Sequence, residues 1–156
     1  MEGLIDRKAV ACEAPVALEF AVRETRAMAE ASRELIIAVV DDDRSVLEAL
    51  EDLLQSAGYR VRLFGSATAL LESGSLADID CLVSDIDLPR VDGFELLRLA
   101  KAARPELPVI LLTGHADMTK RPEPAGARYF RLFKKPFDAQ ELLTAISDAL
   151  RRAAPR

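Results

Sequence analysis

The feature of this sequence that most constrains its fold is a series of five short strand-like segments, separated by stretches with helical spacing. The first segment reads Leu-Ile-Ile-Ala-Val-Val, an unbroken apolar run typical of a strand that is buried on both faces. Each of the other four is also short and rich in apolar residues. We expect strands at 35–40, 60–64, 81–85, 108–114 and 129–133.

Amphipathic helices are predicted between these strands. The stretch 45–57 repeats apolar residues at helical spacing, and Gly58 is well suited to follow its last turn. A Ser or Asp stands where a side chain can cap the start of each further helix. These helices are expected at 66–72, at 92–103 and from 138 onward, with Ser66, Asp92 and Asp138 as the caps.

Strands that alternate with helices through short connections form a parallel sheet with helices on both faces, joined by right-handed crossovers. Five such strands fit a flavodoxin-like, doubly wound fold of the α/β class with strand order 2-1-3-4-5. In that order a ligand site lies at the carboxyl ends of the strands, at the switch point between the first and third strands.

One connection departs from this alternation. A helix between the fourth and fifth strands would have to come from 116–128, where Pro122 and Pro124 each remove a backbone donor and clash with the preceding turn. The stretch also offers little apolar surface to hold a helix against the sheet. We therefore expect an irregular fourth helix of at most one or two short turns.

The length of 156 residues allows one domain with an appendage. We expect an N-terminal extension at 1–34, which is either helical or disordered, an α/β domain at 35–152 and a short tail at 153–156. An alternative is that Met28 is the true start of the chain.

Composition and charge limit the partners and the compartment. Half of the residues are apolar and 30% are charged, which excludes global disorder. The net charge of −5 argues against nucleic acid or an anionic membrane as a partner, and no apolar run approaches the length of a membrane span. Cys12 and Cys81 form no metal-type motif and the chain opens without a signal-peptide core, so we expect a reduced, cytoplasmic protein.

Polar residues follow the predicted strands at their carboxyl ends. Because the strands are parallel, these ends meet at one edge of the sheet, and the first and third strands are neighbours in the expected order. The single histidine, His115, excludes a multi-histidine metal site and is expected in an exposed loop beside this edge. The residues at the edge are Asp41, Asp42, Asp43, Asp85, Asp87, Thr113 and Lys135.

Their chemistry indicates phosphoryl transfer. The carboxylates of Asp41, Asp42 and Asp85 repel one another strongly at close range unless a cation lies among them, and all-oxygen ligands with room for water suit Mg²⁺. Together with the Lys135 ammonium and the Thr113 hydroxyl, a metal ion can neutralise the oxygens of a phosphoryl group in transfer. Asp85 is the best nucleophile candidate, because it is the lone acid at the end of the middle strand, whereas Asp43 is expected to cap the next helix.

At these residues the chain resembles the receiver domains of bacterial response regulators, the CheY-like domains of two-component systems. The resemblance covers roughly Leu35 to Arg152. VVDDDRSVLEALEDLLQSAGY is similar to the first strand, acidic pair and first helix of the family, and LLTGH and KKPF to its fourth-strand threonine and its lysine–proline pair. SDIDLPRVDGFELL is similar to the pattern D-x-x-M-P-x-x-D-G, with Leu88 in place of methionine.

The resemblance implies a phosphorelay function with roles for single residues. Asp85 would accept the phosphoryl group from a phosphohistidine on a sensor histidine kinase or a phosphotransfer protein. Asp42 would bind Mg²⁺ directly, Asp41 mainly through water, and Asp85 and the backbone carbonyl of Asp87 would complete the metal site. Thr113 would contact the phosphoryl group and report its presence.

For the lysine–proline pair, the resemblance implies that Lys135 bridges phosphoryl group and carboxylate and that its bond to Pro136 is cis. The chain would therefore be a signalling protein rather than an enzyme, acting only on its own phosphorylation and dephosphorylation. Because only 153–156 follow the last helix, we expect a stand-alone receiver with no attached output domain. Its output would be contact with a downstream protein target or a handoff of the phosphoryl group.

Two departures from the family pattern keep alternatives open. The usual aromatic residue on the fifth strand falls on Leu132, and the usual fourth helix falls on the proline-containing stretch 116–128. Both favour a degenerate receiver that binds partners independently of phosphate. A second alternative is a haloacid dehalogenase-type phosphatase, because Asp85-Ile86-Asp87 resembles its D-x-D motif, although that family places the acidic pair last in the chain.

Overall fold

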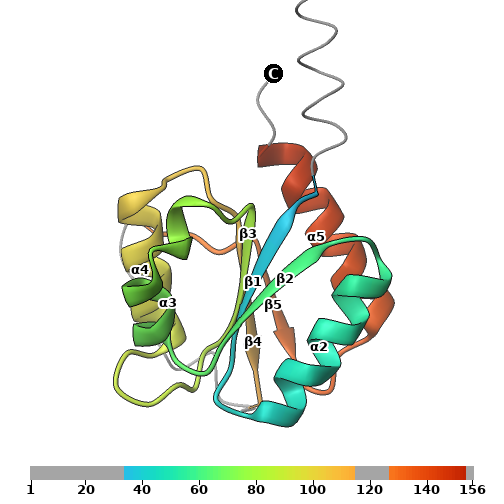
Figure 1. Ribbon diagram of the computed structural model, residues 1–156, viewed down its shortest axis with the longest axis horizontal. Coiled ribbons are helices and arrows are strands. Elements are labelled where there is room, and N and C mark those ends of the chain that lie inside the picture. The colour runs from blue at the N-terminus through green and yellow to red at the C-terminus, as the bar shows by residue number, and fades with distance from the viewer. Residues whose placement is uncertain (1–33, 115–126, 154–156) are drawn as a thin grey trace, which may run out of the picture. The chain divides into compact units, whose positions relative to one another are not determined.

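A computed structural model describes residues 34–114 and 127–153 of the chain (Figure 1). The residues from Leu35 onward belong to one compact unit. Its strands are β1 (Ile36–Val40), β2 (Arg60–Phe64), β3 (Cys81–Asp85), β4 (Val109–Thr113) and β5 (Arg131–Lys134). Its helices are α2 (Arg44–Ser56), α3 (Ala67–Ser73), the short 3₁₀ helix η1 (Ser75–Ala77), α4 (Gly93–Ala103) and α5 (Ala139–Ala153).

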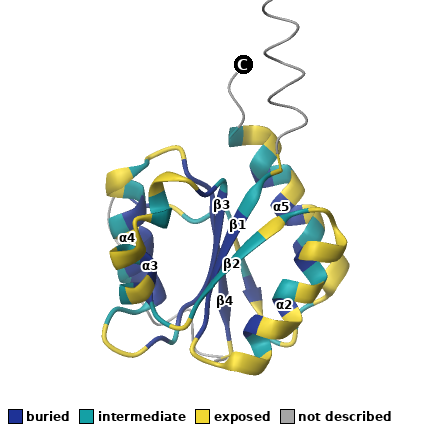
Figure 2. Ribbon diagram, in the orientation of Figure 1, coloured by how far each residue is buried: buried dark blue, intermediate teal, exposed yellow. Residues whose placement is uncertain are grey.

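The five strands form one parallel sheet in the order β2-β1-β3-β4-β5, so the predicted doubly wound fold is confirmed. The central strands β3 and β4 are buried along their whole length, as Figure 2 shows in dark blue. This burial on both faces explains why their sequences are continuous apolar runs instead of alternating patterns. Within the described residues, no helix is long and apolar enough to cross a membrane.

Helices cover both faces of the sheet (Figure 1). Two separate apolar layers lie between the helices and the sheet. On one face α3 and α4 pack through Leu70 and Leu96 against Leu82 of the sheet. On the other face α2 and α5 pack through Leu54 and Ile146. Successive strand residues point to opposite faces, so each strand supplies both layers in turn.

The caps predicted from the sequence are present. The side chains of Asp43, Ser66 and Asp92 accept hydrogen bonds from backbone N–H groups in the first turns of α2, α3 and α4. Asp138 does the same before α5, where its carboxylate accepts from the Glu141 amide at 2.9 Å. These side chains satisfy donors that the first turn of a helix leaves open, which fixes where each helix begins.

Two elements differ from the sequence prediction by more than a one-residue shift of a boundary. The fifth strand lies at Arg131–Lys134 instead of 129–133, because its ladder pairs Arg131 with Ile110 and extends to Lys134 opposite Thr113. The 3₁₀ helix η1 follows Gly74, whose φ of 76° ends α3, and no sequence signal predicts this short helix. The predicted irregular fourth helix at 116–128 and the extension at 1–34 lie outside the described residues, apart from their last residues.

Arg90 has a backbone φ of 68°, in the left-handed region that costs a residue with a Cβ about 1–2 kcal/mol. We expect Arg90→Gly to raise the free energy of unfolding by about 0.5–1 kcal/mol, because glycine adopts this conformation without the steric penalty. Urea denaturation measures the effect. Arg90→Ala is the matched control: it removes the same side chain but keeps the Cβ, so its stability should equal that of the wild type. Equal stabilisation by both variants would show that the backbone is not strained.

Candidate functional site

Strand alternation places three charged residues on the same side of the sheet edge. Asp41 follows β1, Asp85 ends β3 and Lys135 follows β5. Two residues before each of them, a buried strand residue packs in the apolar layer beneath α2 and α5. Strand side chains alternate between the two faces of a sheet, so all three of these charged side chains point to that same face. The regular pleat of three parallel strands therefore brings these groups together from positions that are far apart in the sequence.

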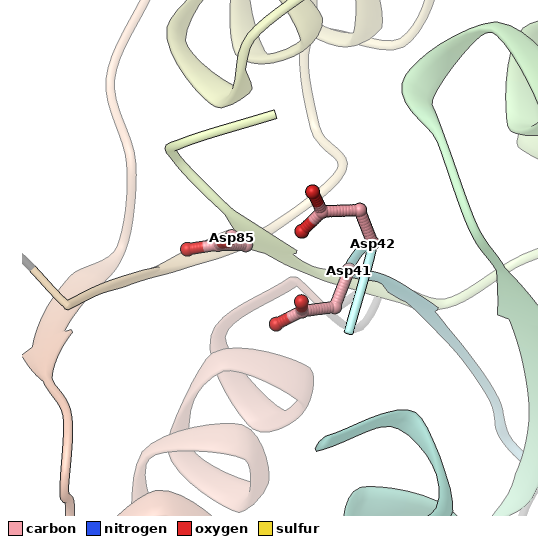
Figure 3. A group of neighbouring side chains, drawn as sticks. All are labelled: Asp41, Asp42 and Asp85. Carbon is pink, nitrogen blue, oxygen red and sulfur yellow. The ribbon is translucent and has the colours of Figure 1, made fainter. Parts of the chain in front are cut away.

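The carboxylates of Asp41, Asp42 and Asp85 form a cluster at this edge. One oxygen of each lies within 4.8 Å of the others, and Figure 3 shows the three side chains gathered at the ends of their strands. Asp41 and Asp85 are only 1% and 5% exposed, whereas Asp42 is exposed to solvent. The expected proximity of the three acids is confirmed, and two of them are held out of water.

The Lys135 ammonium partly balances the cluster. Its Nζ lies 2.9 Å from Oδ2 of Asp41 and 3.5 Å from Oδ1 of Asp85. Burial alone would lower the pKa of Lys135, but its contacts with Asp41 and Asp85 outweigh burial and raise that pKa above its usual value. Lys135 is therefore a permanent cation at neutral pH, placed between two buried carboxylates.

Asp85 remains poorly compensated. Its Oδ1 is buried and, in the part of the chain that the structure describes, accepts no hydrogen bond. Burial raises the pKa of Asp85, and the Asp41 carboxylate raises it further, against a smaller lowering by Lys135 and by a backbone hydrogen bond from Asp87. A buried carboxylate oxygen without a donor, beside two further carboxylates, fits the coordination of a hard divalent cation such as Mg²⁺.

Thr113 and Asp87 lie at the same edge. Thr113 is the last residue of β4 and is 2% exposed. It lies one residue beyond the residue of β4 that pairs with Asp85 in the ladder. Asp87 lies in the loop after β3 and is half-buried. The Lys135–Pro136 peptide bond is cis, as the sequence resemblance implied.

Asp43 supports the cluster without being part of it. Its backbone N–H donates to Oδ1 of Asp41 at 2.9 Å, while its own carboxylate caps α2 through the Ser45 amide. This cap holds the turn after β1 in place and thereby orients the buried Asp41 side chain. The sequence pattern predicts the cap but not the contact of Asp43 with Asp41.

Comparison with known proteins decides the family. The family model for the response regulator receiver domain matches residues 37–147, which is most of the chain. The chain belongs to this family. The strand order and the carboxylate cluster at the ends of β1 and β3, which the alternation of strands and helices predicts, agree with this family.

Two similar relatives are named as regulators. The response regulator protein TmoT of Ectopseudomonas mendocina is 37% identical over 121 residues, which cover 78% of this chain and 55% of the relative. The transcriptional regulatory protein FixJ of Bradyrhizobium diazoefficiens is 37% identical over 119 residues, which cover 76% of this chain and 58% of the relative. The receiver thus spans little more than half the length of these curated relatives.

Solved structures of receiver domains are similar throughout the fold. The signal receiver domain of an HD domain-containing protein from Pseudomonas fluorescens Pf-5 has a TM-score of 0.71 at 32% identity, over 78% of this chain and 98% of that one. The BeF3-activated receiver domain of DrrB has a TM-score of 0.69 at 32% identity, over 77% of this chain and all of that one. The fold assignment therefore rests on sequence and structure together.

The expectation that nucleic acid is excluded as a partner is wrong. FixJ is named a transcriptional regulatory protein, and NtrC of Bradyrhizobium sp., 35% identical over 114 residues, is named a DNA-binding transcriptional regulator. The net charge of −5 describes the residues of this chain alone. A regulator can act on DNA through residues outside the matched region, so the charge of the receiver carries no such exclusion.

The raised pKa of Asp85 leads to a prediction for the metal-free receiver. A carboxyl whose folded-state pKa is raised contributes most stability when protonated, and loses that contribution as pH rises through the folded pKa. In EDTA at pH 7, we therefore expect Asp85→Asn to have a higher Tm than the wild type. The difference should shrink as pH falls through the titration of Asp85. Thermal denaturation of both proteins between pH 4 and 8 measures it, and a difference that does not vary with pH would contradict the assignment.

Proposed function

We propose that this receiver accepts a phosphoryl group on the Asp85 carboxylate, with Mg²⁺ bound beside it, from a phosphohistidine of a sensor histidine kinase or a phosphotransfer protein. The observation that carries the proposal is the buried Oδ1 of Asp85, which lacks a hydrogen bond in the described structure and lies 3.5 Å from the Lys135 ammonium. A buried carboxylate oxygen that is held by no hydrogen bond can coordinate Mg²⁺, and the nearby ammonium favours the ionised form of Asp85, which a nucleophile needs.

In the proposed step, an oxygen of Asp85 attacks the phosphorus of the donor. A new O–P bond forms, the P–N bond to the donor imidazole breaks, and its electron pair stays on the imidazole nitrogen, which then takes up a proton. The product is an aspartyl-phosphate on Asp85. When bound, Mg²⁺ would supply positive charge to the phosphoryl oxygens. The carboxylates of Asp42 and Asp85 and the backbone carbonyl of Asp87 would hold it, with Asp41 acting mainly through water.

Lys135 and Thr113 have separate roles in this proposal. Lys135 already contacts both buried carboxylates, so its ammonium can follow the negative charge as it moves from Asp85 to the phosphoryl oxygens. The Thr113 hydroxyl, at the end of the neighbouring strand, would donate a hydrogen bond to a phosphoryl oxygen. The receiver would then signal by contact with a downstream protein.

A degenerate receiver that acts independently of phosphate is the second candidate, and one observation favours it. Leu132, at the strand position where an aromatic residue is usual, is partly buried against the layer beneath α3 and α4. A leucine packed in that layer has no hydroxyl group of the kind that a tyrosine would carry at this strand position. The complete acidic cluster and its paired lysine favour phosphorylation over this alternative.

The cytoplasmic location and the domain division at 35–152 stay predictions.

Incubation with Mg²⁺ and acetyl phosphate, followed by intact mass measurement, tests the proposal. We expect one phosphoryl group per chain, stable in acid and lost in alkali, as an acyl phosphate requires. EDTA should prevent the addition. No mass increase in the folded protein would overturn the proposed function in favour of the degenerate receiver.

A further inference from the structure

We propose that Ser84 is a positioning residue for phosphoryl acceptance: it locks the peptide unit between Asp85 and Ile86, and through it the acceptor loop. The inference rests on the proposed function of Asp85. Ser84 is fully buried and donates its hydroxyl to the backbone carbonyl oxygen of Asp85 at 2.9 Å.

The geometry of the β3 end explains why this hydroxyl is needed. The ladder between β1 and β3 ends with the pair Val40 and Ser84, and the N–H of the next residue, Asp41, donates to the Phe64 carbonyl of β2. On the side of β3 that faces β1, the Asp85 carbonyl therefore lies one residue beyond the last pair of this ladder. A buried carbonyl without a donor is costly, and the Ser84 hydroxyl satisfies it from within the strand.

The same peptide unit is held at two further points. Its N–H, that of Ile86, donates to the Leu112 carbonyl of β4 at 2.8 Å. The first residue of α4, Gly93, lies so close that an added Cβ would stand 2.5 Å from the Asp85 carbonyl oxygen and 2.6 Å from the Ile86 Cα. The oxygen, the nitrogen and one side of the peptide unit are therefore each fixed by a different element.

This fixed peptide connects the acceptor carboxylate to the next turn of the loop. Ile86 also accepts hydrogen bonds at its own carbonyl from the amides of Leu88 and Gly93, both at 2.9 Å. Asp87 lies inside this turn and gives the Asp85 carboxylate a backbone hydrogen bond. Rotation of the Asp85–Ile86 peptide would move Asp87 relative to Asp85, so the Ser84 hydroxyl controls the alignment of two groups that are proposed to face the same metal ion.

The Ser84 side chain itself lies on the opposite face of the sheet from the Asp85 carboxylate, because successive strand residues alternate. It shares the face of Leu82, in the layer beneath α3 and α4. Ser84 therefore acts through the backbone and does not touch the phosphoryl group, so it is not a catalytic residue.

The test compares Ser84→Ala with Ser84→Thr, which keeps the hydroxyl, and with Ile110→Val, a buried change in the other layer that costs stability without touching this peptide. Phosphorylation by acetyl phosphate at saturating Mg²⁺ is followed by mass measurement. We expect Ser84→Ala to lower the rate constant about tenfold, because small errors in position cost large factors in rate. Ser84→Thr should restore it, and Ile110→Val should leave it unchanged.

A second measurement needs no phosphoryl donor. Hydrogen exchange of the Ile86 amide in metal-free protein should be faster in Ser84→Ala than in Ile110→Val. A wild-type protein that is not labelled overturns the proposed function. A labelled wild type with Ser84→Ala reacting at the same rate, or with unchanged Ile86 exchange, overturns this inference alone.

Discussion

Asp85→Asn is expected to abolish phosphoryl incorporation from acetyl phosphate while the receiver remains folded. The asparagine has nearly the same shape as aspartate, but its amide has no anionic oxygen with which to attack phosphorus. The fold should tolerate the change, because the Asp85 carboxylate is buried, accepts no hydrogen bond at Oδ1 in the described structure and is destabilised by Asp41. Intact mass measurement after incubation with Mg²⁺ gives the result directly.

The matched control for this variant is Asp78→Asn. Asp78 is an exposed acid that pairs with Arg62 before the start of β3, at the opposite end of that strand from Asp85. It undergoes the same change of charge and should be labelled like the wild type. Full labelling of Asp85→Asn would show that another residue accepts the phosphoryl group, and loss of labelling in both variants would indicate an effect of net charge alone.

The fold could be predicted from the sequence because its local signals agree with one another. The strands 60–64 and 81–85 lie where the sequence placed them, since turn residues and apolar runs mark both of their ends. The caps at Ser66 and Asp92 fixed the starts of α3 and α4. The end of β5 was harder to predict, because pairing with β4, and not the local sequence, determines where that edge strand begins and ends.

The proximity of the carboxylates could also be predicted, because parallel strands bring their carboxyl ends to one edge. The relative closeness of the charged groups within the site could not be predicted from the sequence. Lys135 lies closer to Asp41 than to the proposed acceptor Asp85, which depends on side-chain packing that no spacing rule describes. Ser84 gave no signal at all, since a serine in a buried strand resembles any other small residue until its hydrogen bond is seen.

Gly93→Ala is expected to cause the largest loss of stability among the substitutions considered. Helix propensity alone predicts the opposite, because alanine stabilises a helix relative to glycine by about 1 kcal/mol. At this position, however, the new Cβ would lie 2.5 Å from the Asp85 carbonyl oxygen, and backbone atoms cannot move aside as a flexible side chain can. We expect the free energy of unfolding to fall by about 3 kcal/mol, at the upper end for overpacking.

Gly65→Ala tests whether the close approach is the cause. Gly65 has nothing within 4 Å of an added Cβ and no left-handed φ, so alanine there should leave stability unchanged or raise it by up to about 1 kcal/mol. Thermal denaturation of the two variants should differ clearly, with a Tm for Gly93→Ala lower by about 10 °C. If both variants were as stable as the wild type, α4 would have room to move away from the Asp85–Ile86 peptide. That peptide would then not be held by packing, and within the described residues the Ser84 hydroxyl and the β4 ladder would be its only restraints.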